Sequence, residues 1–226
     1  MLMKKPLLLL LPLFAALPLM SQSMRQGVLS DPVAVTKLRF GVTGGVNIAK
    51  ITEKYSGLSI VTSAVTGFRG GVVVDYALGE GLYFQPRVLV SGKGGKLTIL
   101  NVEGTLRPYY LEVPLNFLYK LQAGPGHVFG GLGPYAAMGI FGKVKTKNNS
   151  ATVTRNLNFG TSKTDDLRPF DFGGNFLVGY ELPQGWLLTL NYSLGLCNIV
   201  PPAKGDDQTA KNHYFGISVG YLLSGL

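Results

Sequence analysis

Apolar and polar residues alternate along most of the chain from residue 38 onward. The stretch GWLLTLNYSLGL, residues 185–196, shows this clearly: every second residue from Trp186 is apolar, and those between are mostly small or polar. A period of two is typical of a β-strand whose two faces differ in chemistry. The pattern recurs and predicts eight strands, at 38–51, 62–78, 81–97, 106–121, 127–144, 167–181, 185–199 and 211–223.

The connections between these segments alternate in length. Those near residues 79–80, 122–126 and 182–184 are short and contain the Gly or Pro that turns favour. Those around 52–61, 98–105, 145–166 and 200–210 are longer and polar, and 145–166 is so poor in apolar residues that we expect a mobile loop there. Short turns on one side and long loops on the other are typical of outer-membrane barrels, and an even strand number would place both termini in the periplasm.

The residues opposite the apolar faces indicate which side of the sheet meets lipid. They are mainly Gly, Ser and Asn with a few charges of both signs, which suits the narrow, side-chain-filled lumen of an eight-stranded barrel. We therefore predict an all-β fold, an eight-stranded antiparallel up-and-down transmembrane β-barrel with its apolar face toward lipid. The alternative is a soluble sandwich or lipocalin-like barrel, in which the apolar face would be buried.

Aromatic residues gather where the apolar faces reach the short turns. A ring of Tyr and Trp at one level is typical of a girdle at a lipid–water boundary. The predicted girdle consists of Tyr76, Tyr119, Tyr180, Trp186 and Tyr221.

Composition and the N-terminus support a secreted membrane protein. Only 15% of the 226 residues are charged and 46% are hydrophobic, whereas about a quarter of residues are charged in average proteins. Two lysines, an apolar stretch broken by prolines, and Ser-Gln-Ser predict a signal peptide at 1–23, followed by a periplasmic segment at 24–37 and the barrel at 38–226. A membrane anchor is the alternative for the leader, but its apolar run is short. The single cysteine, Cys197, allows no intramolecular disulfide.

Six stretches carry a resemblance to a known family: GVTGGVNIAK (41–50), GFRGGVVVDYAL with LYFQPRVLVSGKGGK (67–96), YLEVPLNFLYK (110–120), GLGPYAAMG (131–139), FDFGGNFLVGYEL (170–182) and YFGISVGYLL (214–223). In this order and spacing they resemble the outer-membrane β-barrel domain family often labelled PorT-like. The resemblance implies an eight-stranded barrel in a Gram-negative outer membrane. Most such relatives have no defined activity, and some are linked to a protein-secretion apparatus.

The sequence offers little for catalysis. A hydrolase would need a serine close to a histidine and a carboxylate. The two histidines are His127 and His213, and Ser218 lies five residues from His213, hence on the opposite strand face. The stretch SGKGGK, 91–96, lacks the spacing of a phosphate-binding loop, and we interpret it as a loop entry. We predict no enzyme and no cofactor or metal.

Charged residues fall into two predicted groups. The first is an interior network that closes the lumen, with Arg87 paired to Glu112; its members are Arg39, Arg69, Asp75, Arg87, Glu112 and Asp171. The second gathers near the long loops and could contact lipopolysaccharide phosphates, the alternative being solvated loop charge; its members are Lys93, Lys96, Lys143, Lys145 and Lys147. The formal charge of +9 fits an anionic membrane surface, and no zinc-ligand spacing or basic helix favours nucleic acid.

These observations predict an integral outer-membrane barrel with a structural or loop-mediated interaction role. Its expected partners are outer-membrane lipid, lipopolysaccharide, and proteins that the long loops contact. Two alternatives remain open from the sequence. One is a barrel component of a protein-secretion complex, and the other is a secreted soluble barrel that binds a lipophilic ligand.

Overall fold

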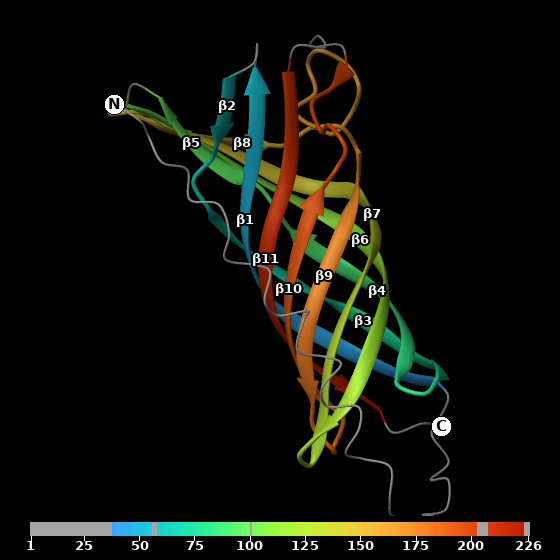
Figure 1. The fold of residues 1–226 in the computed structure, drawn as a ribbon. Coiled ribbons are helices and arrows are strands. Elements are labelled where there is room, and N and C mark those ends of the chain that lie inside the picture. Colours follow the sequence, from blue (N-terminus) through green and yellow to red (C-terminus); the bar gives the residue numbers. More distant parts are fainter. Residues whose placement is uncertain (1–37, 56–57, 100, 203–207, 224–226) are drawn as a thin grey trace, which may run out of the picture. The chain divides into compact units, whose positions relative to one another are not determined.

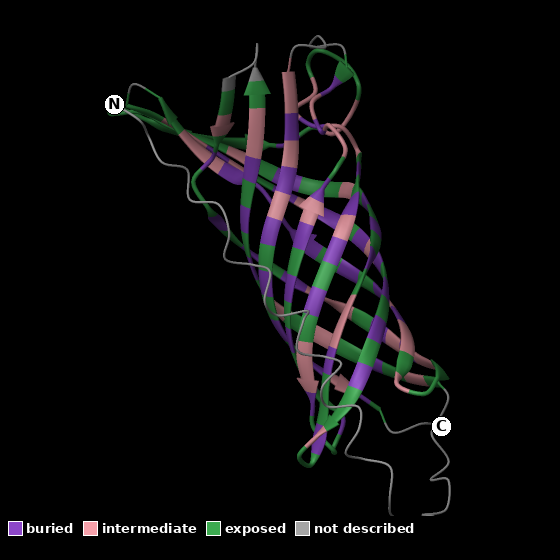
Figure 2. Cartoon of the chain, viewed as in Figure 1, coloured by how far each residue is buried: buried purple, intermediate pink, exposed green. Residues whose placement is uncertain are grey.

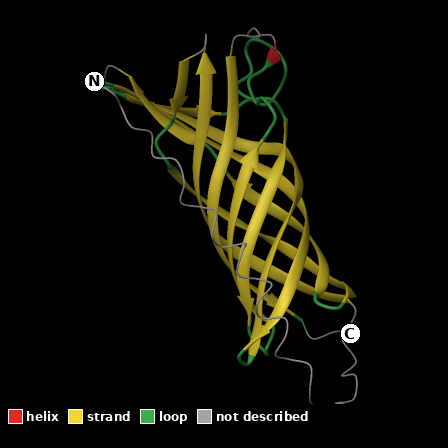
Figure 3. Cartoon of the chain, viewed as in Figure 1, coloured by secondary structure: helices red, strands yellow, loops and turns green. Residues whose placement is uncertain are grey.

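The computed structural model describes residues 38–55, 58–99, 101–202 and 208–223. The predicted signal peptide and periplasmic segment lie outside these residues. The described chain is almost entirely β-structure (Figure 3). No helix in this part of the chain is long and apolar enough to cross a membrane.

Eleven strands follow one another along the chain. They are β1 Leu38–Tyr55, β2 Leu58–Val61, β3 Val65–Gly79, β4 Leu82–Gly92, β5 Gly95–Ile99, β6 Val102–Ala123, β7 Gly126–Lys147, β8 Thr152–Asn156, β9 Phe170–Glu181, β10 Trp186–Gly195 and β11 Gln208–Leu222. Eight of them pair antiparallel in a closed ring, in the order β1, β3, β4, β6, β7, β9, β10 and β11, because β11 pairs with β1 and β6 with β7 (Figure 1). This confirms the predicted eight-stranded up-and-down barrel.

The remaining strands lie outside the ring. β2 pairs with the outer end of β1, β5 with the outer end of β6, and β8 with the outer end of β7. They extend the barrel at the end where the long connections lie. The third predicted strand, 81–97, is therefore two strands, because the chain leaves the sheet between Gly92 and Gly95.

The loop predicted to be mobile at 145–166 is largely structured. It contains the end of β7 and all of β8, and the Asp166 carboxylate accepts hydrogen bonds from Arg155 and from the Asn158 backbone. Leu157 is buried in the barrel mouth although its neighbours are polar. The polar composition of the segment gave no indication that Leu157 is buried, because a single leucine produces no periodic signal.

Lipid-facing and lumen-facing residues alternate as the strand pattern predicts (Figure 2). Leu190 and Phe215 each keep 39% of their surface exposed, whereas Asn191 keeps 2%. A lipocalin-like barrel would bury its apolar face and expose its polar one. The soluble alternative is therefore wrong.

The lumen also contains apolar side chains, in a layer toward each end. The layer nearer the short turns consists of Val73, Leu118, Phe129, Leu177, Leu187 and Leu222. The layer at the outer mouth consists of Ile51, Leu157, Leu167, Ile199 and Ala210, with Phe159 packed against it. Phe159 lies over Gly139, where an added Cβ would come within 2.3 Å of its ring. The polar residues of the lumen lie between and around these layers.

Candidate functional sites in the lumen and on the outer wall

A ring of four charges crosses the lumen next to the short turns. Arg39 on β1 lies 2.5 Å from a carboxylate oxygen of Asp75 on β3 and 2.5 Å from one of Glu181 on β9. Lys120 on β6 pairs with the same two carboxylates, at 2.8 and 2.7 Å. Each carboxylate thus has two cationic partners, as buried charges require. This group, the lower ring, ties four strands together.

A second charged cluster lies near the outer mouth, around Lys93. The Lys93 ammonium is 2.8 Å from Glu112 on β6 and 3.0 Å from Asp171 on β9. Both carboxylates make further bonds, since Tyr214 donates to Glu112 at 2.5 Å and Asn212 donates to Asp171 at 3.0 Å. All three charged side chains are fully buried. One lysine therefore balances two carboxylates inside the barrel.

Three tyrosine rings surround the same ammonium group. The Lys93 nitrogen lies 4.3 Å from the ring centroid of Tyr135, 5.1 Å from that of Tyr110 and 5.5 Å from that of Tyr214. Cations within about 6 Å of an aromatic face are attracted by its quadrupole, most strongly when desolvated. Together with the two carboxylates these rings form a closed cage, which we call the Lys93 cluster.

Two buried arginines lie between the lower ring and the Lys93 cluster. Arg69 donates to the amide oxygen of Asn191, and its guanidinium lies 5.6 Å from the Tyr214 ring centroid. Arg87 donates to the amide oxygen of Gln85 at 2.6 Å, and Gln85 donates to Asp75. The predicted pair between Arg87 and Glu112 is wrong. Glu112 lies opposite Leu89 in the β4–β6 register, and its carboxylate pairs with Lys93 instead of Arg87.

The predicted interior residues thus fall into three groups. Arg39 and Asp75 belong to the lower ring, Glu112 and Asp171 to the Lys93 cluster, and Arg69 and Arg87 lie between. Sequence reasoning missed Lys93, Lys120 and Glu181. Glu181 shares the alternation of Asp171 and Asn175, and this signal alone would have assigned it to the lumen.

The predicted girdle residues lie on the outer face near the short turns. Tyr119 and Trp186 are exposed, while Tyr76, Tyr180 and Tyr221 are half-buried. Trp186 and Tyr221 are cross-strand partners whose ring centroids are 5.0 Å apart. The Tyr180 hydroxyl donates to the carbonyl of Ala123, the last residue of β6. We propose, as the sequence suggested, that these rings mark the periplasmic lipid boundary.

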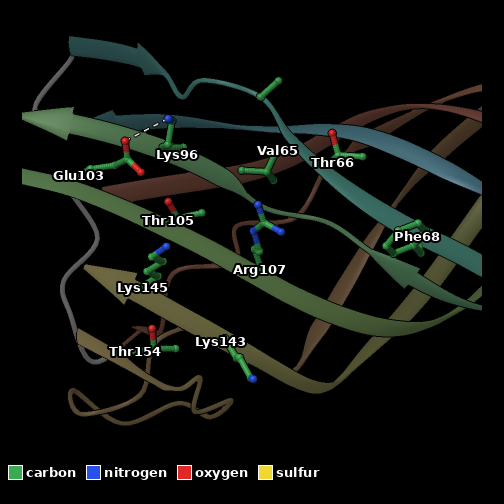
Figure 4. Close-up of a pocket in the computed structure, with 11 residues that line it drawn as sticks. Val65, Thr66, Phe68, Lys96, Glu103, Thr105, Arg107, Lys143, Lys145 and Thr154 are labelled. Carbon is green, nitrogen blue, oxygen red and sulfur yellow. Dashed lines mark hydrogen bonds and ion pairs between the residues drawn. The ribbon is translucent and has the colours of Figure 1, made fainter. Parts of the chain in front are cut away.

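A groove of about 680 Å³ lies at the outer end of the barrel wall (Figure 4). β6 and β7 supply Glu103, Thr105, Arg107, Lys143 and Lys145, and the flanking strands β3, β5 and β8 add Thr66, Phe68, Lys96 and Thr154. Lys96 donates to Glu103 at 3.1 Å. Four cations thus line the groove with one carboxylate among the described lining residues. We call it the basic groove.

The basic groove contains three of the five lysines predicted at the outer side. Lys96, Lys143 and Lys145 line it, and Lys147 follows on β7, opposite Glu103. Lys93 does not belong there, because it is buried in the lumen. Period two extended from Arg87 would have assigned Lys93 to the lumen, but the glycines of SGKGGK favoured a loop. Arg107 was missed, because it lies just beyond the apolar run of its strand.

No described serine lies beside a histidine on one strand face. His127 opens β7 at a short turn, opposite Glu181. His213 lies on the outward side of β11, while Ser193 and Ser218 are buried in the lumen. Within the described residues, no three His, Cys, Asp or Glu side chains are grouped to hold a metal ion.

Comparison with known proteins agrees with this architecture. The family model for the outer membrane protein beta-barrel domain matches residues 20–200. The fold is similar to that of the attachment invasion locus protein Ail of Yersinia pestis, with 12% identity over 81% of this chain and 98% of that one and a TM-score of 0.37. It is also similar to neisserial surface protein A, with 11% identity over 80% and 96% and a TM-score of 0.41.

A third similar structure is the N-terminal barrel domain of Pseudomonas aeruginosa OprF, with 13% identity over 79% of this chain and 97% of that one and a TM-score of 0.31. No curated protein matches the sequence. The resemblance drawn from the strand motifs is confirmed for the outer-membrane barrel domain, while the PorT-like label stays a prediction. Since the family model covers more than half of the residues, the chain belongs to the outer membrane protein β-barrel domain family.

Proposed function

We propose that this outer-membrane barrel has no catalytic activity and acts as an interaction protein through its outer end. The observation that carries the proposal is a sheet that continues past the lipid-facing wall. β6 and β7 run on together to the pair Glu103 and Lys147, and β5 and β8 widen them into four strands. This four-stranded extension is the outer sheet.

One face of the outer sheet exposes apolar side chains. Ile99 and Val102 are cross-strand partners on it, and Val153 of β8 lies on the same face by register. All three are exposed, although they lie beyond the lipid-facing wall. Apolar groups exposed together outside the membrane are typical of surfaces that bind proteins.

The lumen supports a role that does not involve conduction. The lower ring and the Lys93 cluster cross it at two levels, and apolar layers lie beside them. An eight-stranded barrel has room for little beyond its side chains. We infer that the barrel is closed to solutes.

The strand ends support the predicted orientation. β1 starts and β11 ends at the same end of the barrel, since Gly41 pairs with Leu222. The short turns between β3 and β4, β6 and β7, and β9 and β10 lie at that end as well. We propose that both termini face the periplasm, with the outer sheet outside the cell.

The test compares capture of protein partners by two variants in whole cells. The triple variant Ile99→Ser, Val102→Ser, Val153→Ser removes the apolar face, and the control Thr98→Ala, Lys147→Ala changes the opposite face of the same sheet. After surface crosslinking and detergent extraction, we expect wild type and control to retain the same partner and the triple variant to lose it.

Two results would contradict the proposal. One is equal capture by the triple variant, provided that unheated gels show it folded. The other is stepwise conductance of the wild-type barrel in a planar lipid bilayer, which would show that the lumen opens. Co-purification of translocation machinery through the outer sheet would favour the secretion-complex alternative.

A further inference from the structure

We propose that the basic groove binds the phosphate groups of lipopolysaccharide, the glycolipid of the outer leaflet. The inference rests on the proposed function only in taking the outer sheet to lie outside the cell. It names a lipid partner for the outward face of the wall, whereas the protein partner proposed above meets the opposite face of the outer sheet.

The groove lies where the apolar wall ends. On β6 the lipid-facing residues run from Tyr119 to Tyr109, and the next outward residue is Arg107. Ten residues of a strand tilted by about 40° rise about 25 Å, which matches the height of the apolar band of such barrels. Arg107 therefore lies at the level of the outer-leaflet headgroups.

β7 shows the same change at the same height. Its Phe141 stacks on Tyr109 with ring centroids 4.8 Å apart, and the next outward residue is Lys143, which pairs in register with Arg107. Two residues further toward the outer end, Lys145 of β7 lies opposite Thr105 of β6. Lys96 of β5 lies opposite the same threonine, on the other edge of β6. Two rows of cations thus lie directly above an aromatic pair.

These cations point outward from the wall. Arg107, Lys143 and Lys145 are exposed and continue the outward alternation of Tyr109 and Phe141. Charge-assisted bonds from Arg and Lys to phosphate are short and strong, and an arginine can bind two phosphate oxygens at once. The hydroxyls of Thr66 and Thr154, at the groove margins, add neutral donors.

The groove also suits the amphipathic shape of the ligand. Its lower margin is Phe68, an outward-facing side chain on β3 that is among the most exposed apolar groups of the wall. A phosphorylated sugar could lie among the cations while its acyl chains pass over Phe68 and the Tyr109–Phe141 pair. A soluble anionic polysaccharide would gain nothing from these apolar groups, so the lipid is the better fit.

The test measures lipid retained by the full-length folded barrel in detergent micelles. The probe is bisphosphorylated lipid A, and native mass spectrometry counts bound molecules across a lipid titration. The double variant Arg107→Gln, Lys143→Gln removes the lower row, and the matched control Lys50→Gln, Lys163→Gln removes two exposed cations elsewhere at the outer end. We expect the double variant to bind about tenfold more weakly and the control to bind as wild type.

Two further arms identify the chemistry that is recognised. Dephosphorylated lipid A should bind to wild type as weakly as the bisphosphorylated form binds to the double variant. A sulfated oligosaccharide without acyl chains should compete poorly. Equal binding by the double variant, or equal competition by the oligosaccharide, would overturn the proposal. Because this assay involves neither conductance nor protein capture, its failure would leave the proposed function standing.

Discussion

Two lysines three residues apart in the stretch SGKGGK have opposite environments. Lys93 is inside the barrel with none of its side chain exposed, held by two carboxylates and three tyrosine rings. Lys96 is on the outer wall with 38% of its side chain exposed and a single carboxylate partner, Glu103. Position across the wall, rather than residue type, thus decides whether a lysine is buried among several partners or accessible from outside with one.

Lys93 continues the lumen face of Arg87 and Ser91, and Lys96, three residues further on, falls on the opposite face; the backbone bends between the two lysines. Gly94 has a φ of +127°, a conformation that residues with a Cβ rarely adopt. At this point the chain leaves the sheet, and β5 then pairs with β6 beyond the residues that β4 contacts. An added Cβ on Gly94 would lie 2.0 Å from the carbonyl oxygen of Leu106. Gly94 therefore allows the bend between Lys93 and β5, the strand that carries Lys96.

The largest effect is expected from Lys93→Met. Methionine keeps most of the length of the side chain but leaves Glu112 and Asp171 buried together without their shared cation. Breaking a buried ion pair from one side costs about 3–5 kcal/mol, and two facing carboxylates place this case at the upper end. The measurement is the denaturant midpoint in detergent micelles, read from the mobility shift of the folded barrel on unheated gels.

Lys96→Met is the matched control for that experiment. An exposed pair contributes about 0–1 kcal/mol, so the midpoint should stay close to that of wild type. If Lys93→Met and Lys96→Met unfold at the same denaturant concentration, the contrast between the two lysines is wrong.

A smaller loss is expected from Gly94→Ala. The alanine must adopt a strained backbone or shift away from Leu106, and strain of this kind costs about 1–3 kcal/mol. Because the bend also sets the position of β5 and Lys96 beside the basic groove, lipid A retention should fall together with stability. Gly104→Ala is a suitable control, since an added Cβ there finds only one atom near, at 3.9 Å. Gly94→Ala with unchanged stability would show that the bend is not constrained.

The lower ring should tolerate the loss of a lysine better than the Lys93 cluster does. In Lys120→Met, Asp75 and Glu181 each keep Arg39 as a partner. We expect a cost of about 2 kcal/mol, below that of Lys93→Met, because no carboxylate is left without a cation. Urea or guanidinium titration of both variants in the same micelles provides the ranking. The reverse order would mean that the lower ring, rather than the Lys93 cluster, dominates closure of the lumen.

Much of the barrel could be predicted from the sequence because lipid and a narrow lumen impose opposite demands on alternate residues. Phe215, Ile217 and Val219 alternate with small residues so regularly that the strand and its orientation follow directly. The predicted segments accordingly overlap all eight strands of the ring. The additions β2, β5 and β8 were not separated, since strands of four or five residues are too short to give a clear period of their own.

The polar pairings could be predicted only in part. Membership of the lumen follows from alternation, and Asp75 and Asp171 were assigned to it in this way. The partner of each charge depends on the registers of all the strand pairs around the ring. The sequence of a single strand does not specify these registers. Lys93 lies between glycines that obscure the alternation, and Lys120 lies near the end of its strand, beside a tight turn.

The smallest change, Glu103→Gln, should leave stability unaltered and strengthen lipid binding. The hydrogen bond from Lys96 lowers the pKa of Glu103 below its ordinary value, so this carboxylate is ionised at neutral pH and offsets part of the groove's positive charge. Glutamine removes that charge and frees Lys96 for phosphate. We expect lipid A retention to rise about threefold in low-salt micelles and the gain to shrink as salt screens the exposed charges. Glu80→Gln, in the β3–β4 turn at the opposite end, removes the same charge without touching the groove and should change nothing. A gain of equal size in Glu80→Gln would show that net charge, rather than the basic groove, governs lipid A retention. The cations of the outer wall would then differ from those of the interior only in their exposure.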